Sequence, residues 1–345
     1  ILLLVFLVFS VFSFFGFVSA AVIYVPSNYT TIQDAVNNAS DGDTILVDDG
    51  TYNEQLTINK NNLNISSVNG ASSTIVNLGQ PGETTGIWIL ANNTIFNGFT
   101  IKNISTTSSH AQYAIRIRGN NNLISNNIII GQASRDWWND EEDSGINLDG
   151  TSSIITSNNI IENNEIYDFS AMGVQIVGSG GNYNALNNII RNNNIHDIQY
   201  YAIANDRSKN QMITNNTLIN IGPSGHINDS YPSVGVIVWG LNSAGTKIIK
   251  QNLIGIEVGA ALSATQNITI NNSEIRNNSI GIRLTKSSWL TGKVEKNQIK
   301  NNIITDNTYG IFIGSGNSSE IGNNNINYNF ISGNSFGLNS SALNN

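Results

Sequence analysis

The chain has no cysteine and very little proline, methionine or histidine. Its 345 residues include 4 Pro, 2 Met and 3 His. Disulfides therefore contribute nothing to its stability, and a copper site of Cys, Met and His is disfavoured because these residues show no ligand spacing. Charge is also scarce: 12% of residues are charged and the formal net charge is −8. We therefore expect no nucleic-acid partner and no attraction to anionic membrane surfaces.

The N-terminal stretch is a long hydrophobic run. Residues 1–18 carry no charge, and Val18-Ser19-Ala20 resembles the small-residue cleavage site of a signal peptide. We expect residues 1–20 to be a signal peptide that lacks its basic start and initiator Met. The alternative is a retained membrane anchor, because about 18 apolar residues can span a bilayer. Both interpretations place the rest of the chain outside the cell, secreted or at the cell surface, and we expect it to be monomeric.

The dominant positive feature is a short phrase that occurs ten times: Gly or Ala, an aliphatic residue, any residue, and an aliphatic or small residue. Successive copies are 28, 31, 28, 29, 33, 20, 26, 29 and 27 residues apart. Self-similarity at a period of roughly 20–50 residues indicates a solenoid whose repeats share one core. The copies begin at Gly86, Ala114, Gly145, Gly173, Ala202, Gly235, Gly255, Gly281, Gly310 and Gly337.

Each copy of the phrase predicts a β-strand, and Asn-rich segments predict the bends between strands. Apolar residues alternate with a free position, which is typical of a strand with one buried face. Asn pairs such as Asn126-Asn127, Asn163-Asn164 and Asn193-Asn194 precede further aliphatic residues. Asn tolerates a left-handed backbone, and stacked Asn side chains can form amide ladders. The sequence therefore predicts an all-β fold, a single-stranded right-handed parallel β-helix of about a dozen coils over residues 21–345.

The two ends of the predicted solenoid differ. Within residues 28–40, Thr30 or Thr31 can cap a short helix on which Ile32, Ala35 and Val36 share one apolar face. We expect this helix to cover the N-terminal coil, because an open solenoid end needs a cap. At the other end the repeat fades through residues 338–345, which predicts an incomplete C-terminal end.

Alignment of the phrases predicts columns of outward side chains on one face. Neighbours in a column lie about 4.8 Å apart, so Arg118 and Asp149 are close enough to pair. The simplest interpretation of such a pair is a surface ladder that stabilises adjacent strands. The first column contains Trp88, Arg116, Asn147, Gln175, Ala204, Ile237, Glu257, Arg283 and Phe312, and the second contains Leu90, Arg118, Asp149, Val177, Asp206, Trp239, Gly259, Thr285 and Gly314.

Two insertions suggest a groove on this face. The first, residues 135–143, holds Trp137 and Trp138, and the second spans residues 222–232. Aromatic rings beside amide and acidic groups suit a sugar, although the two Trp side chains can instead fold over the solenoid wall. The expected groove floor comprises Gln175, Asp168, His196, Asp197, Asp206 and Arg207. The candidate ligand-binding residues are Trp137, Trp138, Arg116, Arg118, Asn147, Asp149, Gln175, Arg207 and Trp239.

A pair of carboxylates gives the groove a second interpretation. Asp168 and Asp197 align one coil apart, with His196 beside them. Two carboxylates about 5 Å apart can hold Ca²⁺ or act as acid and nucleophile in glycoside cleavage. If the groove is catalytic, Asp168, Asp197, His196 and Asp206 are the candidates. The alternative is that these aspartates belong to solvated turns, and no cofactor other than Ca²⁺ is considered.

The start of the repeat region resembles a known family. Residues 24–36, followed by Asp41-Gly42-Asp43-Thr44 and Gly50-Thr51-Tyr52, are similar to the opening of pectin-lyase-like β-helix proteins. The Asn-rich repeats resemble NosD-like and adhesin-like surface proteins of archaea. This resemblance implies the β-helix fold but not one function, because the scaffold carries lyases, hydrolases, epimerases and adhesins.

The catalytic motifs of the enzymatic relatives are not matched. An Arg-x-Pro-x-x-Arg stretch of the pectate-lyase type is absent, and fragments such as Gly225-His226-Ile227 and Arg116-Ile117-Arg118 occur in the wrong order for a polygalacturonase. We therefore expect an exported, non-catalytic protein that binds carbohydrate or another cell-surface polymer. A polysaccharide lyase or glycoside hydrolase acting on acidic polysaccharide is the first alternative, and a structural envelope spacer is the second.

Overall fold

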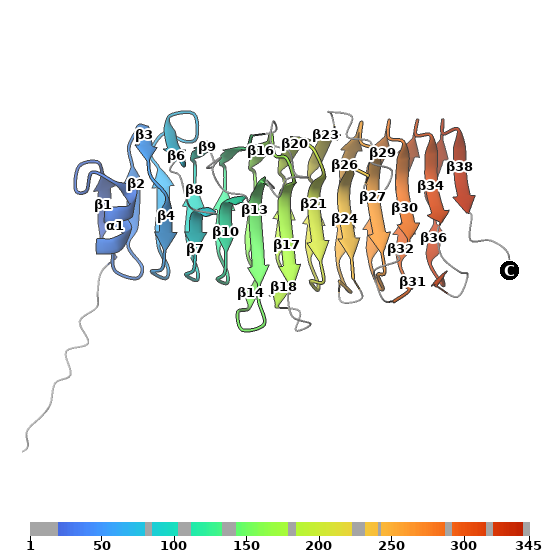
Figure 1. Ribbon diagram of the computed structural model, residues 1–345, viewed down its shortest axis with the longest axis horizontal. Helices are drawn as coiled ribbons and strands as arrows, with labels where there is room; N and C mark the ends of the chain where they lie inside the picture. The colour runs from blue at the N-terminus through green and yellow to red at the C-terminus, as the bar shows by residue number, and fades with distance from the viewer. Residues whose placement is uncertain are drawn as a thin grey trace, which may run out of the picture.

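The chain winds into an elongated stack of parallel strands (Figure 1). The computed structural model describes residues 20–79, 85–102, 112–132, 143–178, 184–222, 232–240, 243–286, 292–314 and 320–340. Three long sheets, here named A, B and C, run along the stack, and from β2 onward each coil contributes one strand to each sheet. The predicted all-β parallel β-helix is confirmed.

Sheet A contains 12 strands, and every pair in it is parallel. Its strands are mostly three or four residues long, because each presents one or two side chains to the core before the chain bends. They are β1 (Val22–Val25), β2 (Thr44–Val47), β5 (Asn64–Ser67), β8 (Ile95–Asn97), β11 (Leu123–Ser125), β15 (Ile160–Glu162), β19 (Ile189–Arg191), β22 (Met212–Thr214), β25 (Lys247–Ile249), β28 (Thr269–Asn271), β32 (Gln298–Lys300) and β36 (Asn325–Asn327).

Sheet B follows sheet A in every coil and contains 11 strands. They are β3 (Gly50–Asn53), β6 (Thr74–Asn77), β9 (Thr100–Lys102), β12 (Ile128–Ile130), β16 (Glu165–Tyr167), β20 (Asn194–Ile198), β23 (Thr217–Ile221), β26 (Asn252–Ile254), β29 (Glu274–Arg276), β33 (Ile303–Thr305) and β37 (Phe330–Ser332).

Sheet C also contains 11 strands and has the longest of them, up to the eight residues of β13. Its strands are β4 (Leu56–Ile58), β7 (Thr85–Ile89), β10 (Gln112–Ile117), β13 (Asp143–Gly150), β17 (Met172–Gly178), β21 (Tyr201–Asp206), β24 (Val234–Trp239), β27 (Val258–Ser263), β30 (Ile280–Thr285), β34 (Tyr309–Gly314) and β38 (Phe336–Ser340). Two short pairs, β14 (Thr156–Ser157) with β18 (Ala185–Leu186) and β31 (Val294–Glu295) with β35 (Ile321–Gly322), complete the strands.

The N-terminal end is closed by helix α1 (Ile32–Asn38), as the sequence predicts. Thr31 is the N-cap, and its side chain accepts a hydrogen bond from the Asp34 backbone N–H at 3.1 Å. The carboxylate of Glu54 accepts hydrogen bonds from the backbone N–H groups of Ile32 and Gln33, the first two residues of the helix. The apolar face, which includes Ile32, is fully buried, so the helix seals the core at this end.

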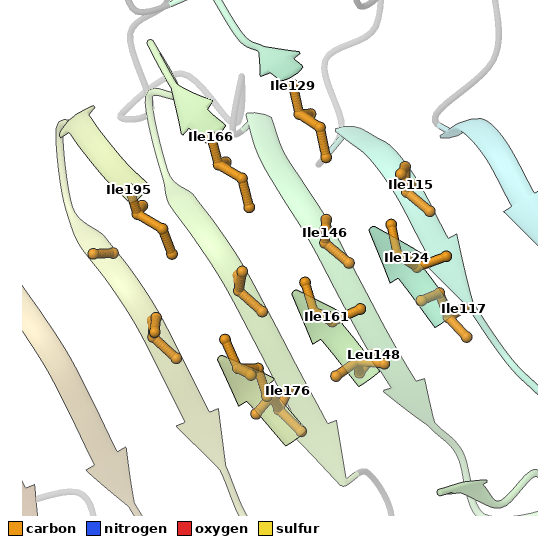
Figure 2. Close-up of a cluster of buried hydrophobic side chains, with 14 of the residues drawn as sticks. Ile115, Ile117, Ile124, Ile129, Ile146, Leu148, Ile161, Ile166, Ile176 and Ile195 are labelled. Carbon is orange, nitrogen blue, oxygen red and sulfur yellow. The ribbon is translucent and has the colours of Figure 1, made fainter. Parts of the chain in front are cut away.

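The core is a set of stacked aliphatic rows inside the solenoid. Figure 2 shows Ile129, Ile166 and Ile195 following one another on β12, β16 and β20. All three are fully buried. Each such side chain contributes about 1.5–3 kcal/mol before the entropy cost. Because every coil buries its apolar side chains against the coils on either side, the stack needs no disulfide.

The two members of each Asn pair have different structural roles. The first Asn takes the left-handed conformation, as at Asn163 with φ 55°. The second Asn is buried and joins a ladder: Asn164 Oδ1 accepts from the backbone N–H of Asn127 at 3.0 Å, and Asn164 N–H donates to Asn193 Oδ1 at 3.0 Å. At the predicted Asn193-Asn194 segment the two roles fall on Asn192, which has the positive φ, and on Asn193, which is the ladder member.

One copy of the repeated phrase lies four residues later in the structure than the sequence predicts. The segment from Gly255 to Glu257 forms the bend before β27, where Gly255 has φ 66°. Ala261 pairs with Ile237 and with Arg283, so Ala261 takes the place in the outward column predicted for Glu257. Both Gly255 and Gly259 fit the phrase in the sequence, and only the strand pairing distinguishes them. In the second column, Ser263 likewise takes the place predicted for Gly259.

Candidate functional site

The outer face of sheet C presents the first predicted column of polar side chains. Trp88, Arg116, Asn147 and Gln175 follow one another in register on β7, β10, β13 and β17. In each strand the residues before and after this position point into the core. Because successive side chains of a strand point to opposite faces, these four side chains point outward. The column is therefore assembled by the repeat itself.

Two arginines converge on one carboxylate beside this column. Asp149 Oδ2 accepts from Arg116 at 3.0 Å (Nε) and 2.7 Å (a terminal guanidinium nitrogen), and from Arg118 Nε at 2.7 Å. The Asp149 side chain is only 8% exposed, whereas those of Arg116 and Arg118 are 21% and 29% exposed. The predicted Arg118–Asp149 pair is present. These three side chains together carry one uncompensated positive charge.

Aromatic rings hold both guanidinium groups in place. The Cζ atoms of Arg116 and Arg118 each lie 4.9 Å from the centre of the Trp88 ring, and Arg116 also lies 4.9 Å from the Tyr113 ring. Such contacts stabilise a cation over the ring face and orient the planar guanidinium group. We call Trp88, Tyr113, Arg116, Arg118 and Asp149 the arginine cluster.

Asn147 extends the arginine cluster toward β17. Its Nδ2 donates to Gln175 Oε1 at 2.6 Å. Its Oδ1 is buried and has no hydrogen-bond partner among the described residues, and the residue is only 1% exposed. A buried carbonyl oxygen without a hydrogen-bond donor lowers the stability of the fold.

Asp206, Arg207 and Trp239 lie further along the same face, at the ends of β21 and β24. Asp206 pairs with Trp239 in register, and the Trp239 ring meets Tyr201 edge to face at 5.5 Å between ring centres. Arg207 donates two hydrogen bonds to Asp206, at 2.8 and 2.7 Å. These bonds raise the pKa of Arg207. Asp206, predicted as a catalytic candidate, and Arg207, predicted to bind ligand, thus form an ion pair with each other.

Asp168 and Asp197 stand one coil apart at the bend between sheets B and C, as predicted. Tyr167 pairs with His196, so the two aspartates that follow are neighbours. Both have a left-handed backbone, with φ 61° and 53°. His196 Nδ1 lies 2.6 Å from Asp197 Oδ2, and the imidazole stacks on Tyr167 with ring centres 4.9 Å apart. Burial and then the charge of Asp197 raise the pKa of Asp168, while His196 opposes the shift.

The predicted groove floor is divided between two places. Asp168 and Asp197 precede β17 and β21, whereas Asp206 and Arg207 follow the core-facing part of β21. A strand of six residues separates them, which is about 17 Å at 3.3 Å per residue. They therefore do not form one site. Trp137 and Trp138, and most of both predicted loops, lie outside the described residues.

A further groove of about 590 Å³ lies on the same bend, closer to the C-terminus. It is lined by Glu257, Ser279, Asp306 and Thr308, among others, from successive coils. The sequence pattern does not predict this groove, because it places Glu257 in a strand. The signal available in the sequence was the recurrence of Asp, Asn or Gly at the left-handed position of this bend, as at Asp306 with φ 57°.

Within the described residues, no three His, Asp or Glu side chains are grouped so that they could hold a metal ion. At Asp168 and Asp197, the predicted calcium site, the structure places two carboxylates on neighbouring coils, with His196 Nδ1 2.6 Å from Asp197 Oδ2.

No helix of the described ranges has the length and apolar character needed to cross a bilayer.

Residues 161–344 match the model of the right-handed β-helix region. The match covers more than half of the 345-residue chain, so the protein belongs to this family of right-handed β-helix proteins. Among proteins with curated descriptions, none matches the sequence.

Several solved structures share the fold. Pectate lyase Pel9A is similar with a TM-score of 0.57 and 14% identity, over 85% of this chain and 80% of that one. The Dettilon tailspike protein has a TM-score of 0.57 and 13% identity, over 88% of this chain and 68% of its own. The A-module of mannuronan C-5 epimerase AlgE6 from Azotobacter vinelandii has a TM-score of 0.50 and 16% identity, over 90% and 92%. The pectin-lyase-like fold is thus established, and it is shared with a lyase, an epimerase and a tailspike.

Proposed function

We propose that this protein is an exported carbohydrate-binding protein that holds an acidic polysaccharide on the outer face of sheet C without cleaving it. The observation that carries the proposal is the arginine cluster. Arg116 and Arg118 share the single carboxylate of Asp149 beside the ring of Trp88, so these three side chains together carry a net positive charge. Guanidinium groups pair with carboxylates and sulfates in a planar, two-point geometry.

The neighbouring amides supply the polar contacts that a sugar requires. Asn147 is buried and its Nδ2 holds Gln175 Oε1, and the part-exposed amide of Gln175 lies next in the column. A carbohydrate site combines an aromatic face with a few fixed polar groups. Trp88, Arg116, Asn147 and Gln175 provide this combination over four successive coils, which suits a chain of sugars better than a single one.

The test is a binding screen of acidic and neutral polysaccharides with residues 20–345. Binding to acidic polymers that weakens as salt increases, and that is lost in Trp88→Ala and Arg118→Gln, supports the proposal. Arg191→Gln is the matched control, because Arg191 pairs with Glu162 on sheet A, away from this face. If all three variants bind as tightly as the parent protein, the binding site lies elsewhere. If the parent protein binds no polymer, a structural spacer is favoured.

The same samples decide between binding and cleavage. A second candidate function, polysaccharide cleavage at Asp168 and Asp197, is favoured by the raised pKa of Asp168 beside a carboxylate held by His196. Two neighbouring carboxyl groups can serve as the acid and the nucleophile in glycoside cleavage. New reducing ends or unsaturated products that disappear in Asp197→Ala would establish an enzyme and overturn the non-catalytic proposal.

A further inference from the structure

Charge is distributed unevenly along the solenoid. Residues 1–206 contain 6 Lys and Arg and 18 Asp and Glu, whereas residues 207–345 contain 10 Lys and Arg and 6 Asp and Glu. The coils stack in chain order along the long axis of the molecule (Figure 1), so this difference in sequence becomes a difference between two stretches of the stack. A positively charged region therefore exists on a protein whose formal net charge is −8.

Most of this positive charge gathers on sheet A. Strands β22, β25, β28 and β32 follow one another in this sheet. Together with the bends on either side of them, they contain six lysines and a single acidic residue, Glu295. Neighbouring coils are about 4.8 Å apart, so the three steps from β22 to β32 cover about 14 Å of the stack. The lysine patch, as we call it, consists of Lys209, Lys247, Lys250, Lys293, Lys296 and Lys300.

The strand register and the bends place these lysines across the whole width of sheet A. Lys247 on β25 and Lys300 on β32 point outward, because the isoleucine beside each of them is fully buried. Lys250 and Lys296 occupy the left-handed positions of the two bends that border the sheet, with φ 54° and 58°. Positive charge therefore covers both edges of the sheet and the face between them.

Little of this charge is neutralised within the chain. Lys247, Lys250 and Lys293 are exposed, and none of them forms an ion pair with another described residue. Lys296 Nζ lies 3.9 Å from Glu295 Oε1, and the lysine side chain is 60% exposed. The potentials of neighbouring charges add over roughly one Debye length, about 8 Å at physiological ionic strength, so a polyanion on this face experiences several lysines together.

The side chains between the lysines suit a polymer rich in hydroxyl groups. Thr214, Thr269, Asn271 and Gln298 occupy outward positions of the same four strands, and none of the outward positions of these strands is aromatic. Hydroxyl and amide groups can form hydrogen bonds with sugar hydroxyls. Single-stranded nucleic acid, in contrast, is normally held by bases stacked on aromatic rings. The surface therefore favours an acidic polysaccharide over a nucleic acid.

We propose that the lysine patch is a second site for an acidic polysaccharide, which lies along the stack from β22 to β32. The arginine cluster is on sheet C around β10 and β13, so the two sites differ both in face and in position along the solenoid. The lysine patch goes beyond the proposed function, because it binds whether or not the arginine cluster does. A protein that uses both sites joins two polymer chains.

The experiment measures the affinity of residues 20–345 for two acidic polymers and for a DNA duplex over a range of salt concentrations. Polygalacturonate carries carboxylates only, whereas heparin also carries sulfates, so the two polymers distinguish the anionic groups. The measurements are made on the parent protein and on a chain with Trp88→Ala and Arg118→Gln, in which the arginine cluster is removed.

Two pairs of substitutions are then added to each of these chains. Lys247→Gln with Lys300→Gln removes two charges from the lysine patch. Lys60→Gln with Lys102→Gln is the matched control, since it removes the same charge from β9 and the bend after β4, several coils away. An unchanged thermal midpoint shows that each variant is folded.

We expect the chain without the arginine cluster to keep salt-sensitive binding to at least one acidic polymer. The patch pair should weaken that binding at least about tenfold and reduce its salt dependence, and the control pair should change it by less than about twofold. If the patch pair alone abolishes all binding by the parent protein, the lysine patch is the site and the arginine cluster is not.

Three results would overturn the proposal. The first is that removal of the arginine cluster abolishes binding to both polymers, which would leave the proposed function intact. The second is that the patch pair and the control pair have equal effects, because the net charge alone would then explain the binding. The third is tighter binding to the DNA duplex than to either polysaccharide, which would make a nucleic acid the occupant.

Discussion

Arg118 Nε and Asp149 Oδ2 lie 2.7 Å apart across two successive coils, and Arg116 binds the same oxygen. The pair connects the stacking of the solenoid to its outer surface, because the short distance exists only when β10 and β13 are in register. The same contact sets the orientation of two guanidinium groups at the proposed carbohydrate site.

Asp149→Asn should destabilise the protein and weaken polysaccharide binding together. The substitution leaves two partly buried arginines without a counter-ion, and we expect the free energy of unfolding to fall by about 1–2 kcal/mol. Urea denaturation measures it. Asp206→Asn is the control, since the Arg207 side chain is 49% exposed and the expected loss there is smaller. An equal fall in the free energy of unfolding of both variants would show that the carboxylate shared by two arginines stabilises the protein no more than the Asp206–Arg207 pair does.

Asn164→Ala should be strongly destabilising because it interrupts a buried ladder. Asn164 Oδ1 accepts from Asn127, and its Nδ2 donates to the Ile124 carbonyl at 2.9 Å and to Asn193 at 3.1 Å. The loss leaves several buried groups unsatisfied, and we expect a cost of about 3 kcal/mol in the free energy of unfolding. Asn164→Gln should cost less, because a Gln serves in the same ladder at position 251. A cost near zero for the Ala variant would contradict the ladder as a source of stability.

Substitutions of Asn163, the residue before Asn164, should change stability according to the backbone conformation that they allow. Asn163 is exposed and has φ 55°, so its contribution is conformational. Asn163→Gly should be close to neutral because Gly adopts this conformation freely, whereas Asn163→Val should lower the free energy of unfolding by about 1–2 kcal/mol. Thermal melts of the two variants distinguish these outcomes, and the prediction fails if Val is tolerated as well as Gly.

Asp168 should make the protein less stable as pH rises. Its pKa in the folded state is raised, through burial and the nearby charge of Asp197, so the folded state holds the proton more tightly than the unfolded state. Stability is therefore lost as pH rises from the unfolded pKa through the higher folded pKa, and the full loss remains at neutral pH. Asp168→Asn removes this loss, so the variant should exceed the parent in stability at pH 7 and lose that advantage in acid.

Unfolding measured between pH 3 and pH 7 provides the comparison for Asp168→Asn. Asp306→Asn is a suitable control because Asp306 occupies the same left-handed position of the bend with an exposed side chain. Both variants keep a residue that tolerates this backbone conformation. If Asp168→Asn follows the parent at every pH, then burial and the charge of Asp197 do not raise the pKa of Asp168 in the folded state.

The sequence predicts the features that recur from coil to coil, and it does not predict features that occur in a single coil. The strands, the inward rows and the Arg118–Asp149 pair follow from spacing, since neighbours in a column must meet. The error at Gly255 arose because two glycines four residues apart satisfy the same phrase, and the choice depends on the pairing of Val258 with Ile280. The meeting of Arg116 and Trp88 depends on rotamers, which the spacing does not determine.

The division of the predicted groove has the same origin. Asp197 and Asp206 are nine residues apart in the sequence, which is compatible with a single site in many folds. Here an extended strand, β21, lies between them and keeps them apart. The groove beside Asp306 was missed because its walls are bends, and bends carry weak sequence patterns.

The coils differ greatly in length while the three sheets stay in register. Equivalent ladder residues are 37 residues apart between Asn127 and Asn164 but 23 apart between Asn193 and Asn216. Much of this variation lies between strands: β12 ends at Ile130 and β13 begins at Asp143 in the longer coil, whereas β20 ends at Ile198 and β21 begins at Tyr201 in the shorter one. The bends are therefore positions at which residues can be gained or lost without disturbing the interior, and a peptide tag or a foreign recognition loop inserted there should leave the stack intact.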